Sequence, residues 1–236
     1  MTMSKQKEGS REKGTLFVVA TPIGNLNDIT FRAVETLKEV SLIAAEDTRR
    51  ARILLSHFGI NTPVTSFFSA GQARKAPVLV EKLLDGCSVA LITEAGTPGI
   101  SDPGHYLVSL ARQAGVKIVP IPGPAAITAA VSASGMKSYS FTFYGFLPRK
   151  GGKRKRALKS LAQLEHPFVL YESPHRLRRT LADLLEFIGN RKLFIAREMT
   201  KIYEEFIDIT VEEAIGMYDT IEPRGEFTLI VGEISS

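Results

Sequence analysis

The sequence predicts an α/β fold of two domains, with a mainly parallel sheet in the N-terminal domain and a mixed sheet in the C-terminal one. Three observations support this prediction. Short apolar runs alternate with helical patterns along the chain, a proline-rich turn interrupts them near the middle, and strand-like runs follow one another closely near the end. The length of 236 residues, with 44% hydrophobic and 23% charged residues, suits one large or two compact globular domains.

The first half of the chain carries five apolar runs of strand length, separated by segments of helical spacing. Parallel strands need crossover connections, so this order favours a parallel sheet covered on both faces. The expected strands are 15–20, 42–45, 64–67, 89–92 and 117–119, and the expected helices lie near 30–40, 48–57, 71–86 and 104–114.

Residues 118–126, IVPIPGPAA, contain three prolines in five positions. Proline cannot continue a helix or a central strand, so we expect a rigid turn here, with a helix beginning after Pro124. This turn is the candidate hinge. The predicted organisation is a flexible tail over 1–13, one α/β domain over 14–124 and another over 125–236.

The second half shows a less regular alternation. Its expected strands are 141–144, 168–171, 193–196, 205–209 and 227–231, and its expected helices lie near 153–164, 175–189 and 211–218. Because the last strands are separated only by a short helix, we expect a mixed sheet.

Several functional classes lose support from what the sequence lacks. Its one cysteine, Cys87, permits no internal disulfide and fits a reducing compartment. The charged N-terminus has no secretory apolar run, and the uncharged stretch 118–136 is broken by prolines, so we expect a cytoplasmic protein without a membrane partner. Phosphate-loop, dinucleotide and serine-hydrolase motifs are absent, and the four histidines are scattered, so no metal site is predicted.

The positive charge is concentrated in one segment. The formal net charge is +5, yet residues 137–159 hold eight Lys or Arg and no Asp or Glu, which leaves the rest of the chain at −3. So dense a patch suits a polyanion, since each neutralised phosphate releases counterions. The alternative is a solvated helix start after a flexible loop.

Glycine- and proline-rich loops follow three of the predicted strands, at 21–25, 94–104 and 120–126. Ligands bind at the carboxyl ends of parallel strands, where glycine lets backbone approach a ligand and proline keeps a loop rigid. Tight strand-to-helix turns would explain any one of these loops, but they explain three at one sheet edge poorly.

Seven strings occur in order along residues 15–233: TPIGNLNDIT, AAEDTRR, EAGTPGISDPG, PIPGPAA, YESPHR, REMTK and GEFTLIVGE. In this combination the chain resembles the 16S ribosomal RNA cytidine-2′-O-methyltransferases, a family of the tetrapyrrole-methylase superfamily. The resemblance implies a two-domain tetrapyrrole-methylase-like fold and S-adenosylmethionine bound between the domains. It also implies a homodimer that acts on 16S rRNA or an assembled small ribosomal subunit.

By this resemblance, mostly small or apolar residues line the cofactor pocket, and backbone groups there suit a neutral adenosine edge. They are Ile23, Gly24, Ala95, Gly96, Thr97, Ile100, Ala125, Ala126, Tyr171 and Met199. Asp102 could offset the amino or sulfonium charge of the cofactor. Alternatively, Asp102 caps a helix that begins at Pro103.

Methyl transfer to a ribose hydroxyl requires alignment and a proton acceptor. Our hypothesis is that Glu46 or Glu198 acts as base, while Arg49, Arg176 or Lys201 holds phosphate or lowers the pKa of the hydroxyl. Structural roles compete with this hypothesis. Asp47 would cap a helix whose arginines face water, the arginines after Pro174 would do the same, and 197–201 would form an ion-pair network between strands.

With RNA as substrate, the basic segment is interpreted as a mobile arm that grips the backbone. The expected RNA-binding residues are Arg149, Lys150, Lys153, Arg154, Lys155, Arg156, His175 and Arg176. Tyr144 and Phe146 would stack on a base, or else belong to the core.

Two other functions remain open from the sequence. One is a small-molecule methyltransferase of the same superfamily, acting on a tetrapyrrole precursor, or a protein-modifying relative that makes diphthine. The other is a non-catalytic assembly factor that binds small-subunit rRNA. The basic segment and the strings YESPHR and REMTK weigh against the first.

Overall fold

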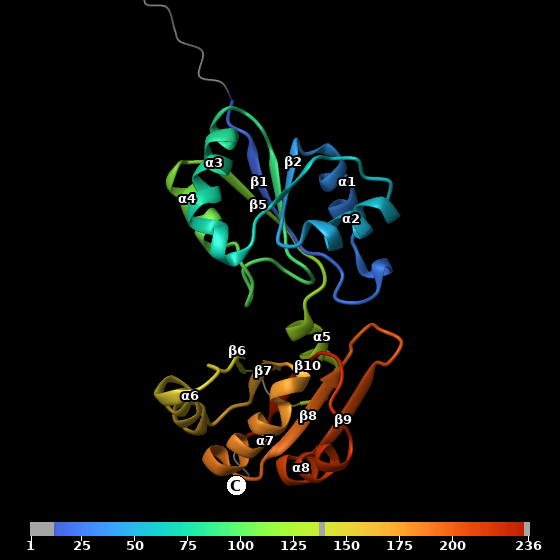
Figure 1. Cartoon of the computed structure of the whole chain (residues 1–236), viewed down its shortest axis with the longest axis vertical. Coiled ribbons are helices and arrows are strands. Elements are labelled where there is room, and N and C mark those ends of the chain that lie inside the picture. The colour runs from blue at the N-terminus through green and yellow to red at the C-terminus, as the bar shows by residue number, and fades with distance from the viewer. Residues whose placement is uncertain (1–11, 137–139, 234–236) are drawn as a thin grey trace, which may run out of the picture. The chain divides into compact units, whose positions relative to one another are not determined.

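The computed structural model describes residues 12–136 and 140–233 (Figure 1). The chain forms two compact units. The first comprises Met1–Pro22 and Leu26–Gly123, and the second comprises Ile23–Asn25 and Pro124–Ser236. Three residues near the N-terminus therefore pack as part of the second unit. Within the described residues, no helix combines the length and hydrophobicity needed to cross a bilayer.

The N-terminal unit contains a five-stranded sheet in the order β3-β2-β4-β1-β5, with every neighbouring pair parallel. This confirms the parallel sheet predicted for the first half. The strands are β1 (Thr15–Val19), β2 (Leu42–Ala45), β3 (Val64–Ser66), β4 (Val89–Ile92) and β5 (Lys117–Ile121).

Helices cover both faces of this sheet (Figure 1). One face packs on α1 (Phe31–Glu39) and α2 (Thr48–His57), and the other packs on α3 (Gln72–Leu84) and α4 (His105–Gln113). Two short 3-10 helices, η1 (Leu26–Asp28) and η2 (Ser69–Gly71), complete the unit. Leucines at helical spacing, such as Leu79 and Leu83 of α3, bury their side chains in these layers.

The strand β5 runs further than the sequence predicts. It includes Pro120, which pairs with Val18 of β1, and ends at Ile121. Proline is tolerated because β5 lies at the edge of the sheet and has β1 as its one neighbouring strand. The missing N–H therefore costs no hydrogen bond to a strand on the other side. The rigid turn is therefore shorter than predicted, and it connects to α5 (Ala126–Ala133).

The C-terminal unit contains a second five-stranded sheet, in the order β6-β7-β10-β8-β9. The β6 and β7 pair is parallel and the other pairs are antiparallel, which confirms the predicted mixed sheet. The strands are β6 (Thr142–Phe146), β7 (Phe168–Glu172), β8 (Lys192–Arg197), β9 (Glu205–Thr210) and β10 (Phe227–Val231).

The two faces of the second sheet are covered unequally (Figure 1). Three helices pack on one face: α6 (Gly151–Ala162), α7 (Pro174–Ile188) and α8 (Val211–Thr220). The other face packs on α5 and on a smaller apolar cluster. The smaller cluster contains several of the predicted cofactor-binding residues.

Candidate active site

The loops that follow β1 and β4 are tied together at the carboxyl edge of the first sheet. Thr21 and Gly96 exchange two backbone N–H···O=C hydrogen bonds of 2.9 Å in an isolated antiparallel bridge. Gly96 has a φ of 77°, a conformation that favours glycine. Thr21 also lines a cavity of about 200 Å³ with Arg50 and Glu94 among its other walls. The first unit therefore holds these two loops in fixed register where ligands bind parallel sheets.

Three carboxylates gather at this edge. Glu46 directly follows β2, whereas Glu94 and Asp102 lie in the loop after β4. Burial raises the pKa of Asp102 to about 6, and the charges of Glu46 and Glu94 add to the effect, while a hydrogen bond with Thr93 opposes it. Asp102 therefore titrates close to neutral pH.

The pKa of Glu46 is also raised. Partial burial is the main cause, and the neighbouring charges of Glu94 and Asp47 add to it, against a hydrogen bond that Glu46 accepts from the Glu94 N–H. Arg50 forms an ion pair of 3.3 Å with Glu94, and both side chains are well exposed. The carboxylates of this cluster thus face one another with little compensation by positive charge.

The helix-capping alternative for Asp102 is wrong, because α4 begins at His105 and its N-cap residue is Gly104. The carboxylate of Asp102 instead contacts Thr93. The predicted cofactor residues Ala95, Thr97 and Ile100 lie in the same loop and are half-buried. Their small or apolar side chains therefore lie near Asp102 along the chain.

Asp47 is the N-cap residue of α2, as the structural alternative predicted. Its carboxylate accepts hydrogen bonds from the N–H groups of Arg49 at 2.7 Å and Arg50 at 3.3 Å, and these bonds lower its pKa. The Arg49 side chain is 87% exposed and lies 3.6 Å from Asp47. Asp47 is therefore structural, whereas the guanidinium of Arg49 reaches into solvent.

Five of the predicted cofactor residues meet in the second unit. Ile23, Ala125, Ala126, Tyr171 and Met199 all belong to the apolar cluster between α5 and the sheet. The phenol oxygen of Tyr171 accepts a hydrogen bond of 3.0 Å from an N–H in the first turn of α5. These five residues, which the resemblance implies for the cofactor pocket, therefore lie together in one apolar cluster of this unit.

Gly24 has a packing reason for being glycine. A Cβ atom there would lie 2.5 Å from Lys201 Cγ and 2.7 Å from Thr200 Oγ1. The next residue, Asn25, donates its N–H to Thr200 Oγ1 at 3.0 Å. Residues 23–25 are thus pressed onto the turn that follows β8.

Glu198 and Lys201 form the ion-pair network that was the structural alternative. Lys201 Nζ lies 2.9 Å from carboxylate oxygens of both Glu198 and Glu226, and the Glu226 N–H donates to Glu198 at 2.9 Å. Burial alone would raise the pKa of Glu198, but these hydrogen bonds and the nearby cations outweigh it and lower the pKa. A carboxylate compensated in this way is a weak proton acceptor.

The basic segment is the start of a helix rather than a mobile arm, because α6 begins at Gly151. Of its residues predicted to bind RNA, those exposed are Arg149, Lys150, Lys153, Lys155 and Arg156.

Arg154 is a correction to the predicted RNA-binding set. It is 2% exposed and donates to Asp183 at 2.6 Å and to Thr180 at 2.9 Å. Its guanidinium therefore joins α6 to α7 inside the unit.

The two residues after Pro174 also differ in their exposure to solvent. His175 is exposed at the start of α7. Arg176 is held inward by an ion pair of 3.3 Å with buried Glu172 and a hydrogen bond to the Leu147 carbonyl. Of the two, His175 is the one whose side chain faces solvent.

Sequence reasoning missed the participation of Glu94 and of the Thr21–Gly96 bridge. Glu94 had a detectable signal, since it follows an apolar strand almost as Glu46 does. The bridge had none, because it joins residues 75 positions apart through backbone atoms.

Comparison with known proteins agrees with the resemblance that the sequence motifs indicate. Residues 15–215 match the model of the Tetrapyrrole (Corrin/Porphyrin) Methylases. The chain is 48% identical over 220 residues to the "Ribosomal RNA small subunit methyltransferase I" of Halalkalibacterium halodurans, an alignment that covers 93% of this chain and 76% of the relative.

Solved structures share the fold at much lower identity. A diphthine synthase superposes with a TM-score of 0.75 at 14% identity, covering 93% of this chain and 90% of the other. The uroporphyrin-III C-methyltransferase of Thermus thermophilus, in complex with S-adenosyl homocysteine, superposes with a TM-score of 0.68 at 18% identity, covering 93% and 98%.

Proposed function

Because the chain belongs to the tetrapyrrole (corrin/porphyrin) methylase family, we propose that it methylates the ribose 2′-hydroxyl of a cytidine in 16S ribosomal RNA. It is a methyltransferase, and its methyl donor is S-adenosylmethionine. The observation that carries the choice of rRNA as substrate is the 48% identity over 93% of the chain to a ribosomal RNA small subunit methyltransferase.

The fold by itself does not select this substrate. The diphthine synthase and the uroporphyrin-III methyltransferase share it at 14% and 18% identity, so the same architecture serves very different acceptors. The exposed cations at the start of α6 favour a polyanion over a tetrapyrrole.

Each unit offers groups that fit the methyl donor. In the first unit, Asp102 is ionised above about pH 6 and would offset the amino or sulfonium charge, beside the half-buried residues Ala95, Thr97 and Ile100. In the second unit, Ala125 and Ala126 are half-buried at the start of α5, and their small side chains would let a neutral adenosine edge approach the backbone. When bound, the sulfonium supplies an already activated methyl electrophile.

The protein's own residues then have to align the ribose hydroxyl and take its proton. We assign proton transfer to Glu46, because its carboxylate is weakly compensated and partial burial raises its pKa. Arg49, whose exposed guanidinium lies three residues later in the first turn of α2, would hold an adjacent phosphate. Alignment is the larger contribution, on the order of 7 to 11 kcal/mol.

Glu198 and Lys201 receive a different role. Their charges compensate each other and Glu226, so neither is poised to exchange a proton with substrate. We propose that they position the turn after β8, which contains Met199 and against which Gly24 packs, and so support the apolar cluster of the second unit.

The proposed RNA surface runs from β6 into α6. Tyr144 and Phe146 are 38% and 49% exposed on β6, and the ring of Phe146 contacts Tyr171 with centroids 5.7 Å apart. The exposed basic residues of α6 follow directly in the chain. Exposed aromatic rings beside cations are typical of single-stranded RNA binding.

Two finer properties belong to the same proposal. A homodimer is supported by the apolar turn between β8 and β9, where Ile202 is 95% and Tyr203 73% exposed. Sedimentation equilibrium of the wild type and of Ile202→Glu tests it, with a monomeric variant as the expected result.

A cytoplasmic location follows from a ribosomal substrate.

Transfer of labelled methyl groups tests the function directly. The acceptors are small ribosomal subunits, naked 16S rRNA and a tetrapyrrole precursor, and the modified nucleotide is mapped afterwards. We expect label on a cytidine ribose in one of the RNA acceptors and none on the tetrapyrrole. RNA binding without transfer would instead support an assembly factor.

A further inference from the structure

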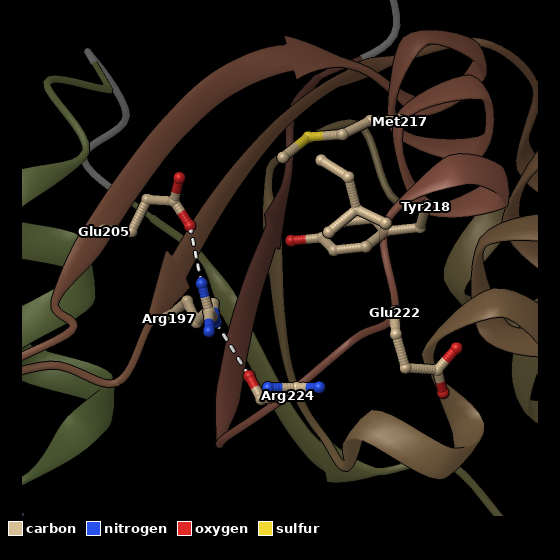
Figure 2. A pocket seen from close by; sticks show the side chains of 7 residues that line it. Arg197, Glu205, Met217, Tyr218, Glu222 and Arg224 are labelled. Atoms are coloured by element: carbon tan, nitrogen blue, oxygen red, sulfur yellow. Dashed lines mark hydrogen bonds and ion pairs between the residues drawn. The ribbon is translucent and has the colours of Figure 1, made fainter.

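A cavity of about 430 Å³ lies in the second unit, and its lining residues have received no functional role above (Figure 2). Its walls come from the end of β8, the start of β9, α8 and the loop 221–226. It lies on the sheet face that α8 covers, because Tyr218 and Met217 pack with the cluster of that face. Met199 and the other proposed cofactor residues of the second unit pack on the opposite face.

One wall carries a buried polar atom without a partner. Among residues 12–136 and 140–233, the buried side-chain polar atom that lacks a hydrogen bond is the phenol oxygen of Tyr218, whose side chain is 2% exposed. Figure 2 shows this hydroxyl directed toward Arg197 and Glu205 across the cavity. Burial and the charge of Glu205 raise the pKa of Tyr218, so the phenol stays a neutral donor.

Tyr218 is held firmly in this position. Its ring packs edge-on against Phe227, with centroids 5.9 Å apart, and its carbonyl accepts a hydrogen bond of 2.7 Å from Arg178 Nε. An unpaired buried hydroxyl is costly, and a side chain so fixed cannot turn to find another partner.

Among the described residues, the charged groups around the cavity are paired except for one cation. Arg197 pairs with Glu205 at 3.0 Å and donates to the Arg224 carbonyl at 2.7 Å, and Glu222 pairs with Arg178 at 2.8 Å. Within the described chain, the guanidinium of Arg224 has no hydrogen bond or ion pair. The remaining wall is apolar, with Met217 and Ile221.

The combination points to a ligand that has three features. It must present a polar edge to Tyr218 and Glu205, an apolar face to Met217 and Ile221, and an anion to Arg224. A nucleobase with its phosphate has all three, because base edges both donate and accept hydrogen bonds and base faces are apolar. Inorganic phosphate or an aliphatic anion has fewer.

We propose that this cavity binds one ribonucleotide, either free or within single-stranded RNA, with its base against Tyr218 and Met217 and its phosphate on Arg224. The proposal rests on the proposed function, since an RNA substrate is the natural source of such a nucleotide. It adds a second RNA contact on the sheet face opposite the cluster that contains Met199.

Two methionines allow the test to separate this site from the cofactor site. Met217 lines the cavity and Met199 lies in the apolar cluster on the other face. In the full-length protein labelled with ¹³C at the methionine methyl groups, we titrate CMP, AMP, inorganic phosphate and a single-stranded RNA hexamer, and separately S-adenosylmethionine. Nucleotides should shift the Met217 methyl resonance, whereas the methyl donor should shift that of Met199.

Variants then locate the contacts. Tyr218→Phe should weaken CMP binding about five- to tenfold through the lost hydrogen bond, without lowering the melting temperature, because the hydroxyl has no partner in the free protein. Arg224→Ala should weaken it about tenfold or more, with a smaller dependence on salt. Arg112→Ala removes an exposed cation from α4 of the first unit and should leave CMP binding unchanged.

Each result decides between the two proposals. If the Met217 resonance does not respond to any nucleotide, the cavity holds only water and this inference is overturned. The proposed function still stands in that case, provided that Met199 responds to the methyl donor and rRNA is methylated. Equal shifts of Met217 with inorganic phosphate also overturn it, as they reduce the cavity to an anion site. A hexamer that binds where CMP does not assigns the source to RNA and upholds it.

Discussion

Two clusters of carboxylates, one in each unit, look alike in the sequence and behave oppositely in the structure. Glu46, Glu94 and Asp102 share the carboxyl edge of the first sheet with only a well-exposed Arg50 nearby, and burial raises the pKa of Glu46 and Asp102. Glu198 and Glu226 share Lys201, and the pKa of Glu198 is lowered. Whether a carboxylate can accept a proton thus depends on whether a cation already compensates it.

The sharpest way to break this comparison is to neutralise one carboxylate of each cluster. Glu46→Gln should reduce kcat for methyl transfer by about 10²-fold or more, because it removes the assigned proton acceptor. Glu198→Gln should reduce it by less than about tenfold, through a loosened turn. The measurement is single-turnover transfer of labelled methyl to the RNA acceptor.

Binding of S-adenosylmethionine, followed by calorimetry, is the control for both variants and should be retained. Equal losses of kcat in the two variants, or a larger loss for Glu198→Gln, would reverse the assignment.

A second test removes the compensating cation. Lys201→Met should lower the free energy of unfolding by about 1 to 3 kcal/mol, because it leaves two carboxylates facing each other. Urea denaturation at neutral pH measures the change. The long methionine side chain keeps contact with Gly24, so a loss caused by packing alone would stay below this range.

The pH dependence of stability should have opposite signs in the two clusters. Burial raises the pKa of Asp102 from 3.8 to about 6 in the folded protein, so its favourable contribution is complete below pH 3.8 and is lost as the pH rises through about 6. Asp102→Asn should therefore be more stable than the wild type at pH 7.5, by about 1 kcal/mol after discounting for the partial exposure of Asp102, and equal to it near pH 3.5.

Glu198 has a lowered pKa, so its contribution is present above pH 4.5 and is lost as the pH falls through its folded pKa. Glu198→Gln should be less stable than the wild type at pH 7, and the gap should close in acid. Chemical denaturation of both variants across this range checks the signs. Parallel pH profiles for the two variants would contradict the contrast.

The smallest effect is expected for the cation of the first cluster. Arg50→Gln should change the free energy of unfolding by less than about 0.5 kcal/mol, because Arg50 and Glu94 are 62% and 43% exposed. Comparison with Lys201→Met in the same denaturation series measures how unequal the two cations are. A loss as large as that of the lysine variant would mean that the first cluster is compensated after all.

The fold was predictable because its signals are local. Alternating apolar runs and helical spacings located all ten strands found in residues 12–136 and 140–233, and the proline-rich turn marked the change between sheets. The end of β5 was predicted too early, since Pro120 excludes a central strand but not an edge strand, and edge position is a property of the whole sheet.

Which charged residues of the predicted site face solvent could not be read from the order of residue types alone. Arg154 and Lys155 are neighbours of the same charge, yet one is buried against Asp183 and the other faces solvent. Helical periodicity could have separated them, since Arg154 lies on the same face as Ala157, Leu158 and Leu161. The unpartnered hydroxyl of Tyr218 had no sequence signal, because it depends on what every neighbour leaves unsatisfied.

The discontinuous second unit constrains how the protein can be divided or synthesised. Ile23–Asn25 pack with residues 124–236, and Asn25 bonds to Thr200. A gene fragment that starts at codon 124 would encode this unit without the piece that covers Thr200 and Lys201. On the ribosome, the same three residues emerge early and must wait for some 175 later residues before their partners exist.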